Sequence, residues 1–106
     1  MGEPSGATGF VAASIADNPN LMVPFYLMLS WLYYERDKSL VDDAFFDRMC
    51  SRLLDEWDSI EHHHKHVVSR ESLAAGTGYD LAYPERVRWA ACCLWNTFNP
   101  TEKIGL

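Results

Sequence analysis

Residues Trp31–Ile60 decide the fold, and they read WLYYERDKSLVDDAFFDRMCSRLLDEWDSI. An aromatic, apolar segment opens the stretch, and the polar residues Asp37-Lys38-Ser39 break it. After the break, apolar residues recur every three or four positions, which is typical of an amphipathic helix. These residues are Phe46, Met49, Cys50, Leu53, Leu54, Trp57 and Ile60. Asp42 and Asp43 suit the positive end of this helix, so we expect it to begin there. The stretch therefore predicts a helical hairpin.

The first arm of the hairpin is predicted to run from about Asn20 to Arg36. Asp17 or Asn18 can cap its start, and Pro19 suits its first turn. Its large apolar residues fall on nearly every face, so we expect it to be the central, most buried helix.

Shorter helical segments flank the hairpin. Residues 10–16 (FVAASIA) form either one or two helical turns or a strap over the core. Ser69 is a candidate N-cap for a short helix over Arg70–Ala75, which Gly76 would close. Pro84 opens a last helix that ends at Asn99-Pro100. The core stripe of that helix is Val87, Ala90, Ala91, Leu94, Trp95 and Phe98.

No alternating strand pattern occurs. We therefore predict an all-α fold, a small bundle of three to five helices around the central helical hairpin. The chain has 106 residues, which suits one small domain. We expect a flexible tail over residues 1–9 and a single helical domain over residues 10–106, because glycine, proline and serine are prominent in the tail.

The charge balance indicates the kind of partner. The chain has fifteen acidic and nine basic residues, which gives a net charge of −6. Because phosphate neutralisation supplies much of the affinity for nucleic acids, this balance argues against direct DNA or RNA binding. An acidic surface instead suits a protein that docks on a basic partner.

The cysteines and the apolar runs indicate the compartment. Cys50 and the vicinal pair Cys92-Cys93 are an odd set that makes a poor disulfide framework. We expect inert core thiols and a cytoplasmic location. No apolar run reaches the roughly 20 residues that span a bilayer, and no signal peptide is expected.

Residues 33–49 (YYERDKSLVDDAFFDRM) carry a family resemblance. They resemble the small N-terminal, Ia-type helical domain of NAD-dependent DNA ligases, which reads Tyr-(His/Tyr)-x-x-Asp-x-Pro-x-(Ile/Val)-x-Asp-x-x-Tyr-Asp-x-Leu. The alignment over residues 33–49 needs no gap. The chain also resembles small phage-encoded proteins with a ligase-like helical hairpin. The resemblance implies a site for the nicotinamide mononucleotide half of NAD.

The resemblance carries the family's contact residues onto five positions of this chain: Tyr33, Tyr34, Asp43, Phe46 and Asp47. Two of them depart from the family. Tyr34 stands in the histidine position and cannot carry a positive charge, and Phe46 lacks the tyrosine hydroxyl. In addition, Ser39 replaces the loop proline. The nucleotidyl-transfer domain with its lysine nucleophile is absent, so ligation by this chain alone is not expected. Alternatively, these residues are a helix-hairpin signature in which Asp43 caps and Phe46 packs.

The histidine-rich run His62-His63-His64-Lys65-His66 is a second candidate site. His62 and His66 would lie one turn apart on a helix and could hold one metal ion. The alternative is a polar helix end, where histidines suit the negative end of the dipole. We predict no metal, with His62 and His66 as the candidates if one binds.

Two functions follow from these observations. The first is a non-catalytic accessory or inhibitor protein that binds a protein partner through an acidic-aromatic helical face. The second is a stand-alone domain that binds NAD or nicotinamide mononucleotide, acting with a separate nucleotidyltransferase. We expect no enzyme activity from the chain alone, because no complete catalytic constellation is present. The sequence does not determine the oligomeric state.

Overall fold

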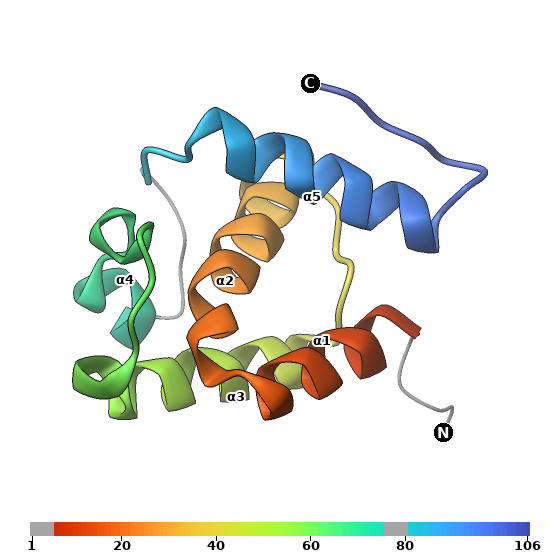
Figure 1. The fold of residues 1–106 in the computed structure, drawn as a ribbon. Coiled ribbons are helices and arrows are strands. Elements are labelled where there is room, and N and C mark those ends of the chain that lie inside the picture. Colours follow the sequence, from red (N-terminus) through yellow and green to blue (C-terminus); the bar gives the residue numbers. More distant parts are fainter. Residues whose placement is uncertain (1–5, 76–80) are drawn as a thin grey trace.

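Helix α2 (Met22–Ser30) runs through the centre of the molecule, with the other helices arranged around it (Figure 1). The computed structural model describes residues 6–75 and 81–106. The surrounding helices are α1 (Gly6–Asp17), α3 (Asp43–Asp55), α4 (Arg70–Ala75) and α5 (Glu85–Phe98). No strand occurs in the described residues, which confirms the all-α prediction.

The burial of α2 confirms that it is the central helix. Seven of its nine residues are buried: Met22, Val23, Phe25, Tyr26, Leu27, Leu29 and Ser30. Figure 1 shows why, because α5 crosses one end of α2 while α1 and α3 pass its other end. Asn18 accepts a hydrogen bond from the backbone N–H of Asn20 at 3.1 Å, and Pro19 opens the 3₁₀ turn Pro19–Leu21. Both features match the predicted cap.

Helix α1 begins at Gly6, so the predicted tail boundary at residue 9 is wrong for residues 6–9. Packing explains the difference, since Ala7 and Thr8 are buried. Phe10 also contacts Phe25 and Phe98, with ring centroids 6.2 and 5.8 Å apart. These contacts stabilise a helix in a glycine-rich segment whose own propensity is low.

The helix α3 begins where predicted but ends earlier than its apolar stripe. It stops at Asp55, and Trp57–Ser59 forms a separate 3₁₀ turn. Met49, Cys50, Leu53 and Ile60 are buried, whereas Phe46, Leu54 and Trp57 are partly exposed.

The two last helices match their predicted bounds. The backbone N–H of Ser72 donates to Ser69 Oγ at 3.2 Å, which confirms Ser69 as the cap of α4. Helix α5 follows Pro84 and ends at Phe98, with Asn99 as its C-cap. In its predicted core stripe Ala90 is exposed, whereas Cys92 is buried. Gly76, which was predicted to close α4, lies outside the described residues.

Candidate binding pocket

A π-helical turn, Trp31–Glu35, continues α2 and supplies one wall of a pocket. Its end is set by Asp37, whose φ of 55° lies in the left-handed region. The backbone N–H of Lys38 then donates to the carbonyl of Leu32 at 2.8 Å, closing the last turn. A left-handed residue at this position is typical of helix C-termini, although glycine is the usual residue there. Short π turns are frequent at functional sites, and the apolar spacing of this helix did not predict one.

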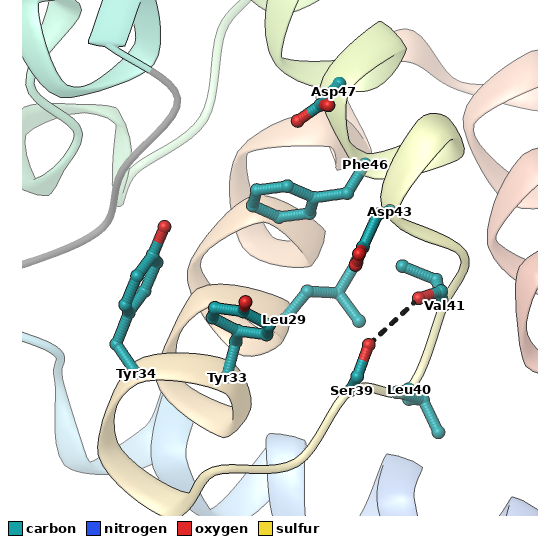
Figure 2. A pocket seen from close by; sticks show the side chains of 9 residues that line it. All are labelled: Leu29, Tyr33, Tyr34, Ser39, Leu40, Val41, Asp43, Phe46 and Asp47. Atoms are coloured by element: carbon teal, nitrogen blue, oxygen red, sulfur yellow. Dashed lines mark hydrogen bonds between the residues drawn. The ribbon is translucent and has the colours of Figure 1, made fainter.

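The pocket lies between this π turn and the start of α3, with a volume of about 210 Å³ (Figure 2). Its described lining is Leu29, Tyr33, Tyr34, Ser39, Leu40, Val41, Asp43, Phe46 and Asp47. All five positions that the family resemblance selected are therefore brought to one cavity. The connection between the two helices supplies three further lining residues, Ser39, Leu40 and Val41, and α2 supplies Leu29. Ser39 Oγ donates to the carbonyl of Val41 at 3.3 Å and steadies that connection.

The first turns of α3 present three residues to the pocket. Asp43, Phe46 and Asp47 are spaced by three and four, so they share one helix face. Phe46 stacks on Tyr26, with ring centroids 5.9 Å apart and planes inclined by 18°. This stacking fixes the Phe46 ring between the pocket and the core. Asp42, rather than Asp43, occupies the N-cap position, and its side chain makes no capping bond.

The tyrosine wall is aromatic and accessible. Tyr33 and Tyr34 meet edge to face, with ring centroids 4.9 Å apart and planes at 78°. Tyr33 is half exposed, at 49%. Figure 2 shows their rings and the Asp43 and Asp47 carboxylates around the same opening. Aromatic faces and carboxylates both attract a cation, the first through the ring quadrupole and the second through charge.

Among the described lining residues, Asp43 and Asp47 are the charged ones, so the pocket is acidic. Two neighbouring cations are engaged elsewhere. Arg36 Nη1 donates to the carbonyl of Gly105 at 2.7 Å. The ammonium group of Lys38 lies over the Trp95 ring, 5.0 Å from its centroid. The side-chain carboxylates of the pocket thus lack a basic partner within its described lining.

The thiols differ from one another in exposure. Cys50 and Cys92 are buried, but Cys93 is exposed, so the prediction that both vicinal cysteines face the core is wrong for Cys93. The helix turns by about 100° per residue, which separates adjacent side chains. Burial, followed by the charge of Asp47, raises the pKa of Cys50 to about 12. Burial also raises the pKa of Cys92. Both buried thiols are therefore held in the unreactive protonated form.

The predicted His62–His66 pair on one helix face is wrong. Residue 62 lies in an irregular segment, and His66 belongs to the 3₁₀ turn Lys65–Val67. Instead, the three consecutive residues His62, His63 and His64 bring ring nitrogens together. Helical spacing could not predict this cluster of three consecutive histidines, because their side chains converge only where the chain turns.

Comparisons with protein-family models, with curated proteins and with solved structures give no match. The resemblance to the ligase domain therefore stays a prediction. Within residues 6–75 and 81–106, no helix combines the length and apolar character needed to cross a membrane.

Proposed function

We propose that this chain is a small non-catalytic binding protein, an accessory or inhibitor of the kind that phages encode. In this proposal, the pocket between the π turn and α3 receives a basic side chain of a protein partner. The observation that carries the proposal is the pairing of the Asp43 and Asp47 carboxylates with the Tyr33 and Tyr34 rings around one cavity.

The chemistry of the pocket favours arginine in the partner. A guanidinium group can stack on an aromatic ring while its N–H groups donate to carboxylates, and arginine is enriched at protein interfaces. Asp43 and Asp47 lie one turn apart on α3, where two like charges destabilise a helix by about 0.2–0.5 kcal/mol. A bound cation would relieve that repulsion, so binding should be coupled to the stability of α3.

The surrounding face also suits a protein partner. The net charge of −6 increases the rate of encounter with a basic protein. The half-exposed Tyr33 supplies the type of aromatic residue that dominates binding energy at interfaces.

A charge-reversal experiment tests the proposal. The wild-type chain and an Asp43→Lys/Asp47→Lys variant are used as baits in a cell lysate. An Asp55→Lys/Asp58→Lys variant is the matched control, because it changes the net charge equally at exposed positions outside the pocket. We expect the wild type and the control to retain the same partner, and the pocket variant to lose it. Retention by both double variants would show that the pocket is not the binding face.

A second candidate is binding of NAD or nicotinamide mononucleotide, and one observation favours it. The five positions selected by the ligase resemblance converge on this pocket. A positively charged pyridinium ring would suit the aromatic and carboxylate walls. However, the phosphate group of the nucleotide needs cationic or N–H donors, and the described lining supplies no lysine or arginine. The basic side chain is therefore the better match.

Thermal melting separates the two candidates. A ligand present at one hundred times its dissociation constant stabilises a protein by about 2.7 kcal/mol, so a bound nucleotide would raise the melting temperature. The protein-binding proposal predicts no increase with millimolar nicotinamide mononucleotide. An increase that disappears in the Asp43→Lys/Asp47→Lys variant would favour the nucleotide instead.

A further inference from the structure

Three consecutive histidines gather their ring nitrogens between the turns Trp57–Ser59 and Lys65–Val67. One ligand nitrogen from each of His62, His63 and His64 lies within 4.8 Å of the others. The ring centroids of His62 and His63 are 4.4 Å apart, and those of His63 and His64 are 4.1 Å apart. In a helix or a strand, consecutive side chains point in different directions, so this convergence is a product of the turn.

The segment that carries the cluster is held at both ends. Ile60 and Val68 are buried and fix its flanks in the core. The backbone N–H of Glu61 donates to Asn20 Oδ1 at 2.9 Å, which ties the segment to the start of the central helix region. Within the segment, Lys65 N–H donates to the carbonyl of His62 at 3.0 Å. The backbone is therefore organised before any ligand arrives, which lowers the ordering cost of binding.

We propose that His62, His63 and His64 bind one divalent transition-metal ion, for which zinc is the representative. Imidazole is a preferred ligand of zinc, copper, nickel and iron. Three histidines with a fourth, open position are a known tetrahedral zinc arrangement. With Zn–N distances of about 2.0–2.1 Å, such a site needs nitrogens roughly 3.3 Å apart. The histidine rings must therefore close from their present separation of up to 4.8 Å. Rotation of these side chains supplies that closure, since His63 is exposed and the other two are partly exposed.

One neighbouring charge opposes metal binding. Arg86 lies close enough to His64 to act on that ring electrostatically, and its positive charge would also repel a metal ion. We therefore expect moderate rather than tight affinity.

A hydrogen bond reports directly on occupancy of the site. The backbone N–H of His64 donates to Nδ1 of His62 at 3.1 Å. Metal bonding at Nδ1 displaces that hydrogen bond. Bonding at Nε2 also displaces it, because the ring proton must then move to Nδ1. Either mode changes the environment of the His64 amide, and this signal needs no substitution.

The chain contains a matched control in its fourth histidine. His66 is exposed and lies outside the cluster, so His66→Ala removes a histidine without removing a proposed ligand. Isothermal titration of tag-free protein with zinc chloride compares the wild type, His63→Ala and His66→Ala. Circular dichroism of each variant checks that the helices are retained. Even outer-shell partners of metal ligands contribute roughly 10- to 100-fold in affinity, so loss of a direct ligand should cost at least that much.

We expect one zinc ion per chain, at least a tenfold loss for His63→Ala and unchanged affinity for His66→Ala. We also expect zinc to shift the ¹⁵N–¹H signal of His64 in the wild type at a one-to-one ratio. Equal losses in the two variants would overturn the three-residue site. Absence of both zinc heat and a His64 shift would overturn metal binding altogether, whether or not the variants fold. These outcomes do not depend on the pocket at α3.

Discussion

The side-chain hydroxyl of Thr8 accepts a hydrogen bond from the backbone N–H of Asp42 at 3.1 Å. The two residues are 34 positions apart, and Thr8 is buried. This bond joins α1 to the start of α3, one residue before the Asp43 carboxylate of the pocket. The N-terminal helix thus helps to position the acidic wall, although it contributes no residue to the described lining.

Thr8→Val should therefore destabilise the fold and loosen the pocket. Valine keeps the shape but leaves the Asp42 N–H without its acceptor, and the unpaired group should cost about 1–3 kcal/mol. Denaturant unfolding measures the change. Thr97→Val is the control, because Thr97 is exposed and its hydroxyl donates to the Cys93 carbonyl within its own helix. Equal stabilities for the two variants would contradict the role of Thr8.

The aromatic ring of Phe46 should contribute to stability, whereas adding a hydroxyl to it should have little effect. Phe46→Ala removes the stacking on Tyr26. Because Phe46 is partly exposed, we expect a loss of about 2–3 kcal/mol, below the roughly 3–5 of a fully buried phenylalanine. Phe46→Tyr introduces the tyrosine of the ligase pattern and should change the free energy of unfolding by less than about 0.5 kcal/mol, as is usual for substitutions at the surface. A large loss for Phe46→Tyr would mean that the ring edge is packed rather than open to the pocket.

The left-handed backbone at Asp37 should discriminate between substitutions. Its φ of 55° strains a β-branched residue, so Asp37→Val should lose about 1–2 kcal/mol of stability. Asp37→Gly adopts this conformation freely and should retain or raise the stability. Thermal denaturation of both variants makes the comparison. If valine were tolerated as well as glycine, the helix would not end in this geometry.

Stability should fall at alkaline pH. The folded state holds the Cys50 proton to a pKa of about 12, against 9.0 for an unperturbed thiol, and burial raises the pKa of Tyr26 as well. The unfolded chain therefore loses these protons first, and the free energy of unfolding decreases as the pH rises above about 9. Denaturation midpoints measured across this range should decrease, with a smaller decrease in Cys50→Ala. A flat profile in the wild type would contradict the burial of these protons.

Alkylation should distinguish the three thiols. Cys93 is exposed, whereas Cys50 and Cys92 are buried. Iodoacetamide at mildly alkaline pH should modify the folded protein once, at Cys93, and modify all three thiols in denaturant. Peptide mass spectrometry identifies the sites. Rapid modification of Cys92 in the folded protein would show that α5 opens readily.

The sequence predicted the elements whose signals are local. Ser69 marks the start of α4, Pro84 marks the start of α5, and the apolar stripe marks α3. The start of α1 escaped prediction because contacts with the distant residue Phe98 stabilise it. The π turn escaped because it alters the hydrogen bonding of the helix without interrupting its apolar pattern.

The sequence predicted which residues line the candidate site, but it did not predict where the neighbouring basic side chains lie. The pattern over residues 33–49 selected five positions, and the hairpin brings them to one cavity. The engagement of Arg36 and Lys38 elsewhere depends on Gly105 and Trp95, which lie more than fifty residues further along the chain. The acidity of the pocket is thus a result of tertiary structure.

Titration with a matched pair of peptides tests the central claim most directly. A short acetylated, amidated peptide with one arginine is compared with the same peptide carrying citrulline, which keeps the shape of arginine but has no charge. The account predicts that the arginine peptide produces saturable ¹⁵N–¹H shifts at Tyr33, Tyr34, Asp43 and Asp47, that citrulline produces little change, and that Asp43→Asn/Asp47→Asn abolishes the shifts. Equal shifts with both peptides, or none at these residues with arginine, would contradict a pocket built for a cation.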